Sequence, residues 1–137
     1  MSRREPLARV LLVEDYPDAL EMYSEMLRSA GYAVVPAKDG QQALDLATTE
    51  RFDLIVLDIA LPKVDGITVI HTLRGQPRTQ YVPIITLSAL TSRGMHKAIL
   101  TAGANLALDK PCLPDKLAAA VRELLVSGRH PAGGGQP

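Results

Sequence analysis

Three short apolar runs that lack alternating polar residues constrain the fold of this chain more strongly than any other feature. They are Val-Leu-Leu-Val at residues 10–13, Leu-Ile-Val-Leu at 54–57 and Ile-Ile-Thr-Leu at 84–87. A strand with one face in water alternates apolar with polar residues, because successive side chains point to opposite faces. A run without alternation predicts a strand buried on both faces, as in a parallel sheet covered by helices on both sides.

Segments with helical periodicity separate the apolar runs, so that strands and helices alternate along the chain. The β-prone segments are residues 9–13, 32–36, 53–57, 83–87 and 105–109. Helical segments are expected at residues 16–30, after the N-cap residue Asp39, around Ile67 and Leu73, at residues 92–102 and from Pro114 onward. This order predicts an α/β fold of the flavodoxin-like, doubly wound type, with a five-stranded parallel sheet in the order 2-1-3-4-5 and helices on both faces.

The length and composition favour one domain in a reducing compartment. The 137 residues fit a single domain, which we assign to residues 8–126. Residues 1–7 form an N-terminal extension, and residues 127–137 a flexible Gly/Pro-rich tail or the start of a linker. The 15 basic and 15 acidic residues balance, which argues against direct nucleic acid binding. One cysteine and no apolar run of about 20 residues predict a cytoplasmic protein that does not cross a membrane.

Polar residues follow four of the five predicted strands directly. Glu14 and Asp15 follow the first strand, Asp58 the third, Ser88 the fourth and Lys110 the fifth. In an open parallel sheet, ligands bind beyond the carboxyl ends of the strands. We therefore expect these side chains to meet at one edge of the sheet and to form the functional site.

The charges of this group predict a magnesium-dependent phosphoryl site. Glu14, Asp15 and Asp58 bring three negative charges, and carboxylates that crowd together repel one another unless a cation joins them. A hard divalent ion with oxygen ligands, above all Mg²⁺, meets this need. An aspartate carboxylate is a known covalent nucleophile for phosphoryl groups. The metal, the Lys110 ammonium and the Ser88 hydroxyl could then neutralise the phosphoryl oxygens on Asp58.

Five segments, taken together and in order, resemble a known family. They are residues 11–15 (LLVED), 53–62 (DLIVLDIALP), 65–66 (DG), 82–89 (VPIITLSA), and 102–105 (AGAN) followed by Lys110-Pro111. In these segments the chain is similar to the receiver domains of two-component response regulators, and the resemblance covers about residues 8–126. It implies a phosphorylation-controlled signalling switch and not a turnover enzyme, since such a domain catalyses only its own phosphorylation and dephosphorylation.

The resemblance also implies a role for each residue of the acidic group. Asp58 would be the phospho-acceptor, and Asp15 a direct Mg²⁺ ligand. Glu14 would assist through a water molecule, and the main-chain carbonyl of Ala60 would also reach the metal.

Ser88 and Lys110 take the remaining roles that the resemblance implies. Ser88 would be the hydroxyl that moves towards the phosphoryl group, and Lys110 the residue that binds it, with a cis bond to Pro111. The phosphodonor would be a histidine kinase or a histidine phosphotransfer protein. Output would pass through protein contacts to a downstream target, with a phosphorylation-dependent dimer as one form that it could take.

The sequence departs from the family pattern at two places that bear on signalling. Ala107 stands where the family usually carries Tyr or Phe, which changes rotamer on activation. Cys112 stands where Phe is frequent, which removes packing volume. Ala60 and Leu90 occupy positions that tune the lifetime of the phosphoryl group, and neither side chain can orient an attacking water. We therefore expect a long-lived phosphorylated form.

Two alternative functions remain. The first is an aspartate-based phosphatase, which usually carries a second acid two residues after the nucleophile to protonate the leaving group. This chain has Ala60 at that position, which argues against turnover. The second is a receiver-like binding module that works without phosphorylation, and the small residue at Ala107 keeps this alternative open.

Overall fold

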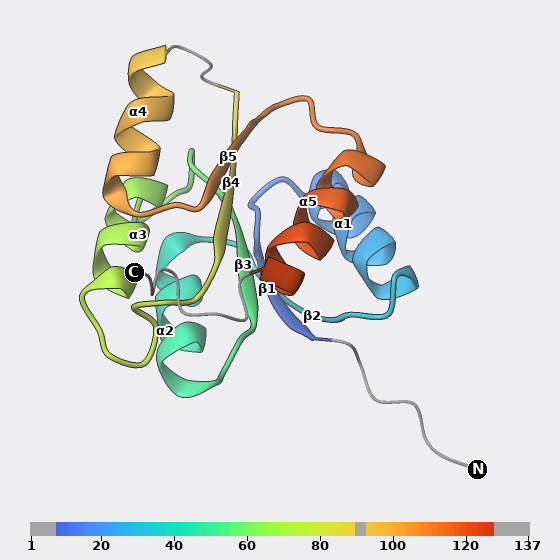
Figure 1. The fold of residues 1–137 in the computed structure, drawn as a ribbon, viewed down its shortest axis with the longest axis horizontal. Helices are drawn as coiled ribbons and strands as arrows, with labels where there is room; N and C mark the ends of the chain where they lie inside the picture. The colour runs from blue at the N-terminus through green and yellow to red at the C-terminus, as the bar shows by residue number, and fades with distance from the viewer. Residues whose placement is uncertain (1–7, 90–92, 128–137) are drawn as a thin grey trace.

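The computed structural model describes residues 8–89 and 93–127, which form five strands and five helices in alternation (Figure 1). The strands are β1 (Arg9–Val13), β2 (Ala33–Ala37), β3 (Leu54–Asp58), β4 (Ile84–Ser88) and β5 (Leu106–Asp109). The helices are α1 (Pro17–Ser29), α2 (Gly40–Thr49), α3 (Gly66–Arg74), α4 (Arg93–Ala102) and α5 (Pro114–Ser127). All neighbouring strands are parallel and lie in the order β2-β1-β3-β4-β5, which confirms the predicted topology.

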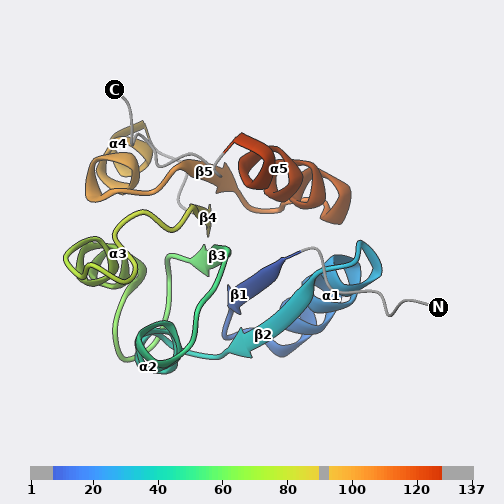
Figure 2. The same ribbon diagram turned by 60° about the horizontal axis from the view of Figure 1, so that its bottom comes forward.

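The helices cover both faces of the sheet, as the uninterrupted apolar runs predicted. Figure 2 shows α1 and α5 on one side and α2, α3 and α4 on the other. Alternate residues of β1 feed the two resulting cores: Leu11 and Val13 pack on the α2–α4 side, whereas Val10 and Leu12 pack on the α1–α5 side. Each fully buried side chain of this kind contributes roughly 1.5–3 kcal/mol to stability.

Two strands extend one residue further than the apolar runs indicated. Asp58 is the last residue of β3 and Ser88 the last of β4, although both were expected just beyond the strand ends. The backbone ladder continues there, because Ile59 N donates to Leu87 O (3.0 Å) and Lys110 N to Ser88 O (2.8 Å). The backbone that carries Asp58 and Ser88 is thus held by hydrogen bonds of the sheet and does not belong to a loop.

The helix boundaries follow from local capping. Asp39 caps α2 by accepting a hydrogen bond from Gln42 N (2.8 Å), and Asp65 caps α3 by accepting one from Thr68 N (3.0 Å). Pro17 opens α1, where its missing N–H costs nothing. Helix α5 includes Ser127, which we had expected in the tail; the rest of the tail and the N-terminal extension lie outside the described residues.

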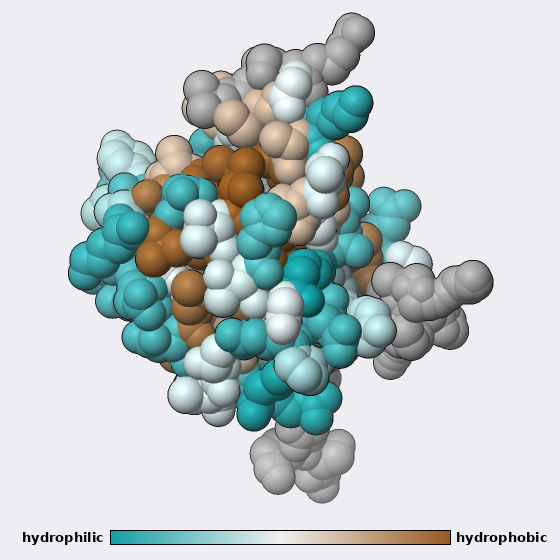
Figure 3. Space-filling model, turned by 90° about the vertical axis from the view of Figure 1, so that its left-hand side faces the viewer, coloured by the Kyte–Doolittle hydropathy of each residue, from teal (hydrophilic) through white to brown (hydrophobic). Residues whose placement is uncertain are grey.

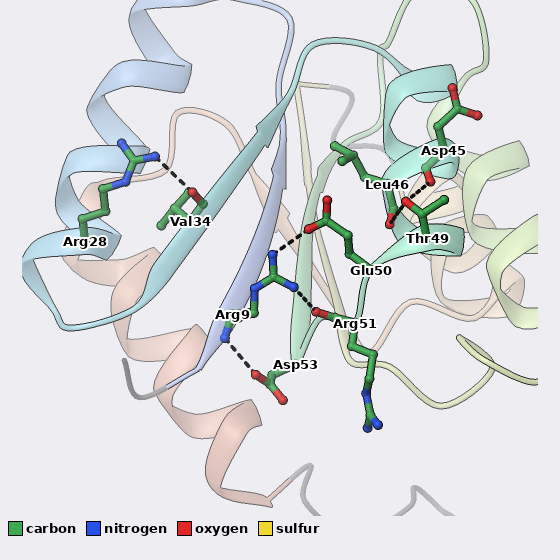
Figure 4. A network of polar contacts seen from close by, with 9 residues as sticks. All are labelled: Arg9, Arg28, Val34, Asp45, Leu46, Thr49, Glu50, Arg51 and Asp53. Carbon is green, nitrogen blue, oxygen red and sulfur yellow. Dashed lines mark hydrogen bonds and ion pairs between the residues drawn. The ribbon is translucent and has the colours of Figure 1, made fainter. Parts of the chain in front are cut away.

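A polar network closes the amino-terminal edge of the sheet, opposite the predicted site (Figure 4). The Arg9 guanidinium donates to Arg51 O (2.6 Å) and to Glu50 Oε1 (2.7 Å), while Arg9 N donates to Asp53 Oδ2 (2.8 Å). These contacts fasten the start of β1 to the segment that leads into β3.

Within residues 8–89 and 93–127, which the structure describes, no helix is both long and apolar enough to cross a bilayer.

Candidate functional site: an acidic cluster beneath a lysine

Three carboxylates converge at the carboxyl ends of β1 and β3. One oxygen each of Glu14, Asp15 and Asp58 lies within 4.8 Å of the other two. The register of the two strands explains this. Val13 pairs with Leu57, so the residues that follow them, Glu14 and Asp58, lie side by side. Glu14 and Asp58 are buried, at 1% and 4% exposure, whereas Asp15 faces solvent.

Lys110 supplies an ammonium group that contacts the acidic cluster. Its Nζ donates to Glu14 Oε1 and to Asp58 Oδ2, both at 3.1 Å. The Lys110–Pro111 bond is cis, as the resemblance implied. The side chain is 25% exposed, so the ion pairs are only partly screened by water.

The surroundings shift the ionisation of two members of the site. Burial raises the pKa of Glu14 above its usual value of 4.5, and repulsion from Asp58 adds to this effect. Burial also disfavours the charged form of Lys110, but hydrogen bonds to Asp58 and Glu14 outweigh it and raise the lysine pKa. Burial thus disfavours the charged form of Glu14, whereas the neighbouring carboxylates favour the charged form of Lys110.

Backbone amides orient the two buried carboxylates. Ala60 N donates to Asp58 Oδ1 (3.1 Å), and Tyr16 N donates to Glu14 Oε2 (3.1 Å). The other oxygen of each carboxylate is the one that accepts from Lys110. Both side chains are thus held in a defined orientation before any ligand arrives, which is the preorganisation that a reactive site requires.

Ser88 lies beside this group at the end of the next strand. Asp58 pairs with Leu87 across β3 and β4, so Ser88 is one residue further towards the same edge. Its side chain is buried, at 3% exposure. All five polar residues that the sequence placed after the strands therefore come together at this edge of the sheet.

The donor set fits a hard divalent cation. Three carboxylates against one ammonium leave two negative charges uncompensated, and every converging ligand atom is an oxygen. Oxygen ligands and excess negative charge are what Mg²⁺ prefers. Histidine and cysteine, which softer metals favour, are absent from the group that converges here among the described residues.

Sequence reasoning missed two contacts near the site. Tyr23 of α1 donates from its hydroxyl to Cys112 O (2.7 Å), 89 residues away, just after Lys110. His96 of α4 contacts Asp109 at the end of β5 (2.5 Å), a partner that the sequence spacing does not indicate. Apolar periodicity marks Tyr23 as a packing residue, but no sequence signal identifies the partner of its hydroxyl.

Ala107, where the family usually carries an aromatic residue, is half-buried at the edge of the core beneath α4. Ala107 pairs with Thr86 across β4 and β5 and packs against the α2–α4 cluster. Within the described residues, the fully buried Thr86 Oγ1 has no hydrogen-bond partner. Leu90, one of the two positions expected to set the phosphoryl lifetime, lies outside the described residues.

The fold and the acidic site define a response regulator receiver domain, and the chain belongs to that family, which it matches over residues 10–122. It is 43% identical to the transcriptional regulatory protein PrrA of Mycobacterium tuberculosis over 117 residues, which are 85% of this chain and 49% of PrrA. It is 31% identical to the polar-differentiation response regulator DivK of Brucella anthropi over 102 residues, 74% of this chain and 83% of DivK. The chain thus spans about half the length of several curated relatives, PrrA among them.

Solved structures agree with this assignment. A putative response regulator from Chloroflexus aurantiacus superposes with a TM-score of 0.84 at 34% identity, covering 89% of this chain and 99% of that one. The receiver domain of the sensor histidine kinase PA1611 from Pseudomonas aeruginosa gives 0.81 at 36% identity, covering 87% and 98%. The latter structure contains a magnesium ion coordinated in its active site cleft.

Proposed function

We propose that this receiver domain accepts a phosphoryl group on Asp58 and thereby switches its contacts with a downstream protein. The observation that carries the proposal is the buried Asp58 carboxylate, whose two oxygens are oriented by Lys110 Nζ and Ala60 N. A buried, oriented carboxylate in an acidic cluster has no evident structural use, since burying charge is costly. It suits a nucleophile that reacts with an incoming phosphoryl group.

The donor would be the phosphohistidine of a histidine kinase or of a histidine phosphotransfer protein. An Asp58 carboxylate oxygen attacks the phosphorus atom, a P–O bond forms, and the P–N bond to the donor imidazole breaks. The imidazole keeps the electron pair of that bond and takes up a proton. Lys110 is positioned to meet the phosphoryl oxygens, because its ammonium already lies 3.1 Å from Asp58 Oδ2.

The acidic cluster would hold Mg²⁺ through Asp15, Asp58 and the main-chain carbonyl of Ala60, with Glu14 acting through a water molecule. When bound, the ion supplies positive charge against the phosphoryl oxygens. The magnesium ion in the related PA1611 receiver domain supports this assignment. The excess negative charge of the cluster supports it independently.

The domain would be modified once per signalling cycle and would not turn over a substrate. A phosphatase needs a proton donor for the leaving group, and the residue two positions after Asp58 is Ala60, which has no acidic side chain. The same feature leaves no side chain at this position to orient a hydrolytic water. A long-lived phosphorylated form follows, and rapid loss of the phosphoryl group in magnesium buffer would contradict it.

Output would pass through the surface around α4. Figure 3 shows the side of the molecule that α3 and α4 form, where apolar side chains reach the surface in the middle and upper part. Leu100 of α4 is 47% exposed. A protein target suits this surface better than nucleic acid, because the 15 basic and 15 acidic residues of the chain balance. A phosphorylation-dependent dimer would use the same kind of contact.

The alternative is a binding module that works without phosphorylation. Ala107 favours it, because the usual aromatic side chain is missing from the strand next to Ser88. Intact mass spectrometry after incubation with acetyl phosphate, with and without Mg²⁺, separates the two functions. We expect a magnesium-dependent gain of one phosphoryl group in the wild type and in Asp45→Asn, an exposed control, and no gain in Asp58→Asn. No gain in any protein would favour the binding module.

A further inference from the structure

We infer that Tyr23 is a positioning residue for Lys110: its hydroxyl holds the segment after Lys110 in place and so keeps the ammonium over the acidic cluster. This inference rests on the proposed function of the site. The contact joins α1 to the connection between β5 and α5, and it lies on the face of the sheet that α1 and α5 cover (Figure 2).

Burial makes the hydrogen bond of Tyr23 a strong constraint. The Tyr23 side chain is 3% exposed and packs in the α1–α5 core together with Cys112. Its hydroxyl donates to Cys112 O over 2.7 Å. Burial raises the pKa of the Tyr23 hydroxyl, so it remains a donor at neutral pH. Water cannot replace this donor readily, and removing it would leave the Cys112 carbonyl without its partner.

The connection between β5 and α5 is short, so this bond acts close to Lys110. Lys110 N donates to Ser88 O (2.8 Å) where the strand ends, and Leu113 O accepts from Lys116 N and Leu117 N (3.0 and 3.1 Å) where the helix begins. Pro111 has no N–H to offer. Between these two ends, Tyr23 of α1 donates a hydrogen bond to the carbonyl of Cys112, two residues after Lys110.

Displacing Lys110 should have two effects of opposite sign. The ammonium occupies the same carboxylates that would bind a cation, at 3.1 Å from Glu14 Oε1 and Asp58 Oδ2. Its withdrawal removes a competing positive charge, and Mg²⁺ should bind more tightly. Phosphoryl transfer should become slower, because the ammonium no longer meets the phosphoryl oxygens. A general loosening of the fold would instead weaken metal binding and slow transfer together.

Tyr23→Phe tests the inference, since it removes the hydroxyl and keeps the ring in the core. The control is Tyr32→Phe, which removes the hydroxyl of another buried tyrosine in the same core, just before β2. Three quantities are measured in the full chain: Mg²⁺ affinity by calorimetry, the acetyl phosphate reaction rate at saturating Mg²⁺, and Lys110 acetylation by mass spectrometry. Lys97, an exposed residue of α4, serves as the internal reference for acetylation.

We expect Tyr23→Phe to bind Mg²⁺ about fivefold more tightly, to react about fivefold more slowly and to expose Lys110 to about fivefold faster acetylation, the equivalent of one buried hydrogen bond. Tyr32→Phe should match the wild type. Unchanged Lys110 acetylation, or weaker Mg²⁺ binding, would overturn the inference. The acetylation arm needs neither metal nor phosphodonor. If the wild type is not phosphorylated, the proposed function is refuted. If Lys110 acetylation is nevertheless faster in Tyr23→Phe than in the wild type, the positioning role of Tyr23 still stands.

Discussion

Lys110 Nζ contacts Asp58 Oδ2 at 3.1 Å, and this ion pair joins two residues that are 52 positions apart in the sequence. The same nitrogen contacts Glu14, so one cation serves two buried anions. Removing the lysine leaves two buried charges without a partner, which is costly, whereas removing one carboxylate relieves the repulsion between the two anions. The site is therefore sensitive to the removal of any one of them, and the direction of each effect can be derived.

Replacement of Lys110 by Met should destabilise the domain by about 1–3 kcal/mol at pH 7, because it leaves two buried carboxylates without their cation. The pKa of Lys110 is raised above 10.5, so its stabilising effect is complete below pH 10.5 and is lost as the pH rises through the folded-state pKa. Urea unfolding of both proteins at pH 7 and at alkaline pH measures this. Lys97→Met is the control, and an equal loss in both variants would contradict the ion-pair account.

Glu14→Gln should stabilise the metal-free domain at pH 7. The pKa of Glu14 is raised above 4.5 by burial and by Asp58, so the folded state disfavours its charged form. Wild-type stability therefore falls as the pH rises from 4.5 through the folded-state pKa, whereas the Gln variant does not pay this penalty. Unfolding curves between pH 4 and 7 should show the two proteins converging at the acid end. Glu21→Gln, on the exposed side of α1, should show no such pH-dependent difference.

Thr86→Val should stabilise the domain by about 1–2 kcal/mol, because it replaces a buried hydroxyl without a partner among the described residues by a methyl group of similar shape. Thr79→Val is the matched opposite case. Thr79 Oγ1 is also buried, but it donates to Leu73 O over 2.6 Å. Thermal unfolding of the two variants should shift in opposite directions, and a loss of stability in Thr86→Val would show that its hydroxyl has a partner in solution.

Gly40→Ala should destabilise the domain by more than about 3 kcal/mol. A Cβ atom at Gly40 would lie 2.0 Å from Val64 O, which belongs to the backbone of the connection between β3 and α3 and cannot rotate away. Gly94→Ala is the control, since a Cβ atom there meets nothing within 4 Å. It should instead stabilise α4 by about 0.5–1 kcal/mol, because alanine loses less backbone entropy than glycine. Chemical denaturation of both variants measures the difference.

The sequence predicted the architecture well because local patterns carry it. Uninterrupted apolar runs identified β1, β3 and β4, and Asp39 marked the start of α2 through a bond to a residue only three positions away. The convergence of Glu14, Asp58 and Lys110 followed from strand order alone, since parallel strands present their carboxyl ends at one edge.

The remaining features depend on contacts that no local pattern records. Arg74 donates to the carbonyls of Gly103 and Thr79 and to the Asn105 side chain, joining α3 to the segments before β4 and β5. These partners can be read only from the folded chain. The contact between His96 and Asp109 is of the same kind, since each residue alone is typical of an exposed surface. The strand ends were misplaced by one residue because Asp58 and Ser88 are polar, although the ladder includes them.

The two apolar cores on opposite faces of the sheet have a consequence for how this sequence can change. Neighbouring residues of one strand, such as Leu11 and Leu12, contribute to different cores and are kept apart by the backbone between them. Substitutions in separate cores that share no partners should have nearly additive effects on stability. The layer beneath α2, α3 and α4 can therefore accumulate changes without compensating changes beneath α1 and α5, so the two faces of the domain can diverge independently of each other.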